Sequence, residues 1–93
     1  MDRLAIIVEY QIKPEFRVEF EQRLKLEAAA TLRDDGCLRM EILTPQGEPH
    51  RLLLSELWRD RAALDAHGNA PGHSHAWCEY MLESRRATVC TTT

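Results

Sequence analysis

One expected strand, residues 51–58 (RLLLSELW), carries leucines on both of its faces. Successive side chains of a strand point to opposite sides of a sheet, so Leu52 and Leu54 face one way and Leu53 and Leu57 the other. A strand that is apolar on both faces is normally covered on both faces. A chain of 93 residues forms a single domain and is too short to supply both covering layers. We therefore expect a homodimer in which a second copy of the chain covers the remaining sheet face.

The other segments predict the element order β-α-β-β-α-β. Alternating apolar residues indicate strands, and apolar residues at four-residue intervals, such as Phe16, Phe20 and Leu24, indicate a helix. The strands are expected over residues 3–13, 37–44, 51–58 and 87–93, and the helices over residues 14–33, 61–67 and 73–86. With residues 61–67 and 73–86 taken as one interrupted helical region, this order is that of the ferredoxin-like α+β fold, an antiparallel four-stranded sheet with the helices on one face. We expect one such domain over residues 1–93.

Turn and capping residues separate these elements. Asp34-Asp35-Gly36 stops the first helix, with Gly36 available for a left-handed cap. Asp60 precedes the second helix and is expected to be its N-cap. Gly68 is expected to end that helix directly after His67.

Charge and cysteine content exclude several classes of function. The formal net charge is −3 and no segment gathers basic residues with interleaved aromatics, so we expect no nucleic-acid partner. The apolar run near the N-terminus is too short for a signal peptide or a membrane span. Cys37, Cys78 and Cys90 are odd in number and form no CxxC pair, which favours reduced thiols and a cytoplasmic location.

Three of the four histidines lie in the segment HGNAPGHSHAWCEY, residues 67–80. Their spacing matches no HExxH-type zinc signature, and we expect no metal site. His67 has two interpretations: a helix C-terminal residue favoured by the helix dipole, or a general base facing a pocket. His73 and His75, two residues apart, would lie on different sides of a helix, and the segment is interpreted as an imidazole-rich pocket rim.

Glu56 stands inside the apolar strand, where a carboxylate needs a partner. It is either paired structurally, with Arg39 or Arg51 as candidates, or it is a pocket carboxylate that orients a substrate or an imidazole. Trp58 points to the same side and is either packing or a pocket wall. Alternation and helix facing add further candidates for pocket-lining contacts with a small-molecule substrate, namely Arg39, Tyr10, His73 and Trp77.

Several short runs resemble the antibiotic biosynthesis monooxygenase family. They are Asp35-Gly36-Cys37-Leu38, then Ser55-Glu56-Leu57-Trp58, Arg59-Asp60, Ala62-Ala63-Leu64 and His67. The resemblance implies a dimeric α+β barrel with a pocket in each monomer between sheet and helices. It also implies oxidation of phenolic or anthrone-type compounds by molecular oxygen without a cofactor. His67 would be the base or proton shuttle, and Glu56 its orienter or a substrate contact.

The resemblance leaves other functions open. Haem-degrading relatives carry an Asn on the first strand and a Trp near the position of His67; both are missing here, so haem degradation is not expected. The chain is also similar to isomerases of a phosphorylated autoinducer sugar, in which a histidine and a carboxylate move protons without oxygen. Arg39 facing inward would favour such a ligand. A non-catalytic binding module is the third hypothesis, and a pocket collapsed by side chains would favour it.

Overall fold

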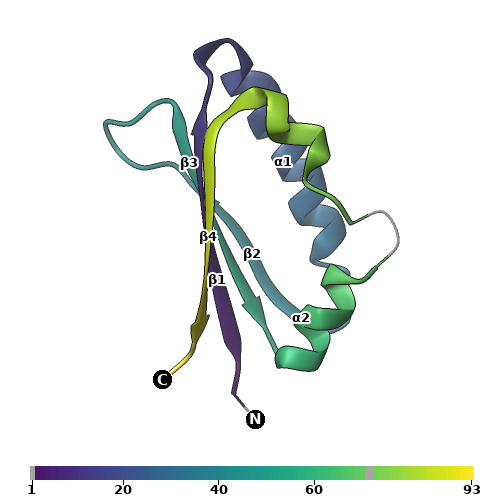
Figure 1. Cartoon of the computed structure of the whole chain (residues 1–93). Helices are drawn as coiled ribbons and strands as arrows, with labels where there is room; N and C mark the ends of the chain where they lie inside the picture. Colours follow the sequence, from purple (N-terminus) through teal and green to yellow (C-terminus); the bar gives the residue numbers. More distant parts are fainter. Residues whose placement is uncertain (1, 71–72) are drawn as a thin grey trace.

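The computed structural model describes residues 2–70 and 73–93 and contains one antiparallel sheet with the strand order β2-β3-β1-β4 (Figure 1). The strands are β1 (Leu4–Ile12), β2 (Cys37–Leu43), β3 (Arg51–Trp58) and β4 (Leu82–Thr91). The helices are α1 (Arg17–Thr31) and α2 (Arg61–Gly68), with 3-10 turns η1 (Pro14–Phe16) and η2 (Ala76–Met81). The predicted ferredoxin-like α+β fold is confirmed.

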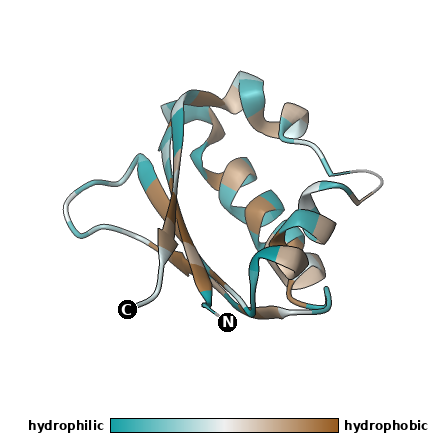
Figure 2. Cartoon of the chain, turned by 60° about the horizontal axis from the view of Figure 1, so that its bottom comes forward, coloured by the Kyte–Doolittle hydropathy of each residue, from teal (hydrophilic) through white to brown (hydrophobic). Residues whose placement is uncertain are grey.

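The two central strands carry most of the core. Along β1 every second side chain, including Ile6, Val8 and Tyr10, is buried against the helices, and the intervening ones are half-buried or exposed. On β3, Leu52 and Trp58 are fully buried on the same face. The helix α1 closes the core with the predicted apolar stripe, and its buried residues are Phe20, Leu24 and Ala28. Figure 2 shows that apolar residues, coloured brown, are frequent along the strands and on the helices that lie over the sheet.

Two local features hold α2 against the end of α1. Gly36 has φ +85°, the left-handed conformation expected for it, and a Cβ there would lie 2.3 Å from the Cβ of Ala63. Its carbonyl accepts a bond from the Arg59 amide at 2.8 Å. Asp60 caps α2 as predicted, because its side chain accepts the Ala63 amide at 2.9 Å. This close approach fixes where the last turn of α2, and therefore His67, is placed.

The predicted helix over residues 73–86 is wrong. Only Ala76–Met81 is helical, as a 3-10 turn, and β4 already begins at Leu82 rather than at residue 87. Nearly the whole of β4 pairs with β1, from Leu82 beside Ile12 to Thr91 beside Leu4. Without β4, one edge of the central strand β1 would have unpaired backbone groups, so this pairing overrides the local preference for helix.

The other face of the sheet has no helix in the described part of the chain (Figure 1). Ile7, Leu53 and Leu57 point to this face and are only half-buried. Leu43 lies beside Leu53 and is 39% exposed. Among the described residues, no helix has the length and apolar character needed to cross a membrane.

Candidate functional site

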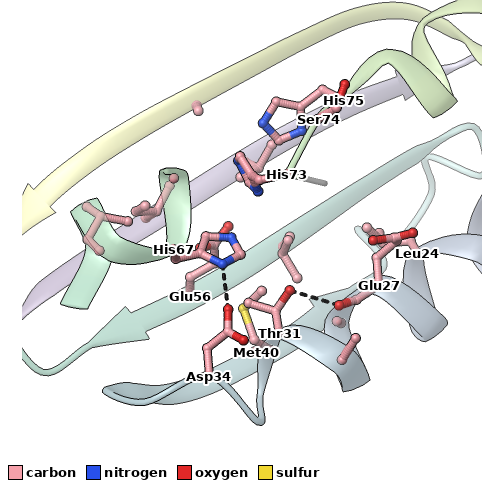
Figure 3. A pocket seen from close by; sticks show the side chains of 18 of the residues that line it. Leu24, Glu27, Thr31, Asp34, Met40, Glu56, His67, His73, Ser74 and His75 are labelled. Carbon is pink, nitrogen blue, oxygen red and sulfur yellow. Dashed lines mark hydrogen bonds and ion pairs between the residues drawn. The ribbon is translucent and has the colours of Figure 1, made fainter. Parts of the chain in front are cut away.

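A cavity of about 520 Å³ lies between the sheet and the layer formed by α1, α2 and the segment before β4. Its apolar wall comes mainly from the sheet and α1, and includes Ile6, Val8, Leu24, Met40 and Leu54. Its polar groups come from several separate elements (Figure 3). A pocket of this size with a largely apolar wall and a few polar groups is typical of small-molecule sites.

His67 and Asp34 form the most direct polar contact in the cavity. The Nδ1 of His67 lies 2.6 Å from a carboxylate oxygen of Asp34, drawn as a dashed line in Figure 3. The last turn of α2 supplies His67, and the turn that ends α1 supplies Asp34. An ionised carboxylate only accepts hydrogen bonds, so the proton of this bond sits on Nδ1. In the neutral imidazole, Nε2 then carries the lone pair and can accept a proton.

Glu56 is held by its neighbour on the same strand. The indole Nε1–H of Trp58 donates to a carboxylate oxygen of Glu56 at 2.9 Å, and both residues are buried. The ring centroid of Trp58 also lies 4.9 Å from that of His67. Trp58 therefore supports both the carboxylate and the imidazole from behind.

A row of rings continues from His67 along the rim of the cavity. The centroids of His67 and His73 are 4.4 Å apart, and those of His73 and His75 are 5.1 Å apart, in both cases edge to face. An Nη atom of Arg85, on β4, then lies 3.3 Å from Nε2 of His75. Partial burial is the main cause that lowers the pKa of both rim histidines; the neighbouring His67 adds to the lowering at His73, and Arg85 adds to it at His75.

Two aromatic residues, Tyr10 and Trp77, line the cavity and pack on the buried Phe20. Tyr10 is buried and packs edge to face on Phe20, with ring centroids 4.9 Å apart. Trp77 stacks on Phe20 at 5.7 Å. Burial raises the pKa of Tyr10 to about 12, although the nearby Arg85 acts in the opposite direction. Tyr10 is thus a neutral hydroxyl donor at ordinary pH.

The structure brings five of the seven predicted site residues to one cavity, namely Tyr10, Glu56, His67, His73 and Trp77. Arg39 and Trp58 do not line it. Arg39 pairs in register with Leu57, which puts it on the opposite sheet face, where it bonds Ser55 at 3.0 Å. The expectation of an inward-facing Arg39 is corrected for this reason. Trp58 lies behind the cavity wall and is completely buried.

Sequence reasoning missed Asp34 and Arg85. Asp34 was interpreted only as part of a helix stop, and its contact with His67 joins residues 33 positions apart. The structure gives His67 this partner in place of Glu56, the predicted orienter. Arg85 was assigned to a helix. Had residues 82–91 been read as a strand, the alternation Arg85, Ala87, Val89 would have placed Arg85 on the cavity side.

Within residues 2–70 and 73–93, no group of three or more His, Cys, Asp or Glu side chains is arranged to hold a metal ion. The three cysteines are free thiols. Burial raises the pKa of Cys37 and of Cys78, which keeps both thiols protonated at neutral pH.

A model of the antibiotic biosynthesis monooxygenase family matches residues 3–78. The chain belongs to this family. Solved structures with the same fold include a conserved protein from Methanosarcina mazei, with a TM-score of 0.91 and 22% identity over 100% of this chain and 95% of that one.

Two further structures extend this comparison of the family fold. A candidate antibiotic biosynthesis monooxygenase from Deinococcus radiodurans has a TM-score of 0.89 and 22% identity over 97% of this chain and 92% of that one. A Pseudomonas aeruginosa protein has a TM-score of 0.88 and 22% identity over 100% and 96%. At this identity the likeness establishes the fold alone. No protein of curated function matches the chain.

Proposed function

We propose that this chain is a cofactor-independent monooxygenase that oxidises a small hydrophobic aromatic or quinol-like compound with molecular oxygen. The observation that carries the proposal is the His67–Asp34 contact at 2.6 Å on the wall of a largely apolar cavity. Such a pair removes a proton from a phenol or an activated methylene group and stabilises the resulting imidazolium. The apolar surroundings strengthen electrostatic interactions with the anion that forms.

The reaction can be balanced for an anthrone-type methylene group. His67 accepts one proton from the methylene carbon at Nε2, and the carbanion gives one electron to molecular oxygen. The substrate radical and superoxide combine to form a carbon–oxygen bond, and the peroxide anion takes back the proton from His67. Loss of water, which carries away one oxygen atom and both methylene hydrogens, leaves a carbonyl group. The electrons come from the substrate alone.

Glu56 and Tyr10 have supporting roles in this proposal. Glu56 is fixed by Trp58 and offers an acceptor to a substrate hydroxyl. Tyr10 stays neutral because burial raises its pKa, and its hydroxyl is a donor for an acceptor group of the substrate at the end of the cavity near Arg85. A cavity that side chains leave open also favours ligand binding over a purely structural module.

Oxygen uptake tests the proposal. A panel of hydroquinones and anthrones is added to the purified protein in an oxygen electrode. We expect uptake with at least one compound, and His67→Gln to lower kcat by about a hundredfold to ten-thousandfold. Asp34→Asn is expected to lower it as well, because the bond that fixes the tautomer of His67 weakens. Asp35→Asn is the matched control, since Asp35 is 90% exposed and pairs with Arg59.

Two results would overturn the proposal. One is an absence of uptake above the buffer rate with every compound in the panel. The other is full activity in the His67→Gln variant, which would show that any oxidation occurs without this base.

An isomerase of a small phosphorylated metabolite is the second candidate. Arg85 lines the cavity and is an ordinary phosphate-binding side chain, which favours an anionic ligand. The same His67–Asp34 pair would then move a proton between two carbons. Deuterium incorporation from heavy water into a sugar phosphate, without oxygen uptake, would identify this activity.

We also propose that two copies of the chain pack through their uncovered sheet faces, as the leucines on both faces of β3 predict. The support is the half-buried apolar surface of Ile7, Leu53 and Leu57, together with the absence of a covering helix among the described residues. In such a dimer both cavities stay on the outer, helix-covered sides. A cytoplasmic location is proposed from the free thiols alone.

A further inference from the structure

Most charged side chains on the cavity wall already have a hydrogen-bond or ion-pair partner, although Glu56 keeps its charge because its partner is the uncharged indole of Trp58. Asp34 contacts His67 at 2.6 Å, and Glu56 accepts from Trp58. Arg23 lies 3.6 Å from Glu27 and covers the ring of Trp77. Each of these groups is therefore at least partly neutralised or satisfied before a ligand enters.

Arg85 is different. Among the described residues its guanidinium makes no ion pair, and the groups it contacts, a ring nitrogen of His75 and the hydroxyl of Tyr10, carry no negative charge. Its strand neighbour Tyr10 adds a hydroxyl donor on the same face of the sheet. A guanidinium and a neutral phenol side by side offer several hydrogen-bond donors to one anionic group.

The position of Arg85 relative to the base sets the shape of a ligand. His67 and Arg85 are separated by two imidazole rings, those of His73 and His75, which form the rim between them. Below this rim the wall is apolar, with Val8, Leu54 and Ala87 contributed by three neighbouring strands. A flat fused aromatic system lies against such a wall with one substituent at each polar end.

We propose that Arg85, assisted by Tyr10, is a subsite for a carboxylate group on the aromatic substrate. This inference rests on the proposed function and names its substrate class: a hydroxylated fused-ring aromatic acid, with a hydroxyl at His67 and the carboxylate at Arg85. The carboxylate end sits at the exposed side of the cavity on the edge strand β4, so it keeps part of its hydration while the ring is buried.

Calorimetric binding without oxygen tests the subsite independently of turnover. The probes are naphthol and hydroxynaphthoic acid, which differ by the carboxylate alone, with naphthyl phosphate as a third ligand. We expect the wild-type protein to bind hydroxynaphthoic acid at least about tenfold more tightly than naphthol. Arg85→Met is expected to bring this ratio close to one while leaving the affinity for naphthol unchanged, which also shows that the variant is folded.

Two further variants make the result specific to the side chain. Arg85→Lys retains the charge but not the planar fork, so it should keep part of the preference. Arg61→Met removes the same charge from an exposed position on α2 outside the cavity, and should leave the preference unchanged.

The outcomes separate this inference from the proposed function. Equal binding of naphthol and hydroxynaphthoic acid, or a preference that survives in Arg85→Met, overturns the subsite and leaves the oxidation intact. Stronger binding of naphthyl phosphate than of hydroxynaphthoic acid overturns the carboxylate in favour of a phosphate. Failure of all three ligands to bind counts against both the carboxylate subsite and the proposed oxidation. If hydroxynaphthoic acid binds more tightly than naphthol in an Arg85-dependent way but no compound causes oxygen uptake, the subsite is supported and the monooxygenase proposal is rejected.

Discussion

The two faces of the sheet are built from the same strands and differ in what covers them. On β3, Leu52, Leu54, Glu56 and Trp58 face the helices and are all buried. Leu53 and Leu57, between them, face away and are only half-buried. The covered face holds the cavity and its polar groups, whereas the uncovered face holds apolar surface and paired charges such as Arg51 with Glu9.

The difference shows which face can enclose a ligand and which face is open to the proposed second copy of the chain. A ligand cavity needs a layer that stands off from the sheet, and α1 and α2 provide it (Figure 1). A flat sheet face without such a layer encloses nothing, but it is complementary to a second flat sheet. The alternation of a single strand thus separates the side that holds the cavity from the side proposed for assembly.

The largest effect is expected from substitutions at adjacent positions on opposite faces. Trp58→Ala should lower the free energy of unfolding by about 3–5 kcal/mol, because it empties a fully buried site and leaves Glu56 without its donor. Leu57→Ala should cost about 1 kcal/mol in dilute protein. Denaturant titrations of both variants provide the measurement.

Repeating both measurements at several protein concentrations distinguishes the two faces further. If Leu57 lies in the proposed dimer, its cost should grow as the protein is concentrated, while that of Trp58 stays constant. Equal concentration dependence for both variants would contradict the division of the sheet into a ligand face and an assembly face.

A charge on the uncovered face should prevent assembly. Leu53→Lys is tolerated locally, since Leu53 lies in register with Glu9, but it buries two ammonium groups in a symmetric interface. We expect the dissociation constant of the dimer to rise by roughly a hundredfold, or about 3 kcal/mol. Sedimentation velocity gives the mass. Leu26→Lys is the control, because Leu26 is 69% exposed on the outer side of α1. A wild-type protein that sediments as a monomer would remove the assembly face altogether.

A methyl group at Gly36 should disturb the helix-covered face. Gly36→Ala places a side chain at a positive φ and forces its Cβ against Ala63, so α2 must move away. We expect a loss of roughly 2–3 kcal/mol. Gly47→Ala is the matched control, because Gly47 has φ +80° but nothing within 4 Å of the added Cβ. Its loss should be about 1 kcal/mol. Equal losses would show that the contact with Ala63 does not position α2.

Features that follow from the spacing of apolar residues and from local capping residues were predicted from the sequence. The strands β1, β2 and β3, the buried stripe of α1 and the Asp60 cap all follow from local patterns, and the structure places each within about a residue or two of its predicted bounds. Five predicted site residues also reach the cavity, because strand alternation fixes which way Tyr10 and Glu56 point.

The remaining features depend on contacts between distant segments. The boundary of β4 was misplaced because pairing with β1, which lies some 70 positions earlier in the chain, decides it. Asp34 reaches His67 only because Gly36 allows α2 to pack closely on the end of α1. Neither contact has a local pattern from which it could be read.

The smallest effect is a pH dependence that belongs to the cavity side. The pKa values of His73 and His75 are lowered from their ordinary value of 6.5, mainly by burial. The unfolded chain therefore binds these protons at a higher pH than the folded chain, so stability is complete above about pH 6.5 and declines as the pH falls.

Thermal unfolding should show a lower midpoint at about pH 5.5 than at pH 7. Replacing both residues with Asn should reduce this slope, whereas His50→Asn, in the exposed β2–β3 loop, should leave it unchanged. Because both rings remain partly accessible to water, we expect the difference between the two unfolding midpoints to be small. A slope unaffected by the double substitution would place the responsible groups outside the rim, and the rim would then be no more sensitive to acid than the uncovered face.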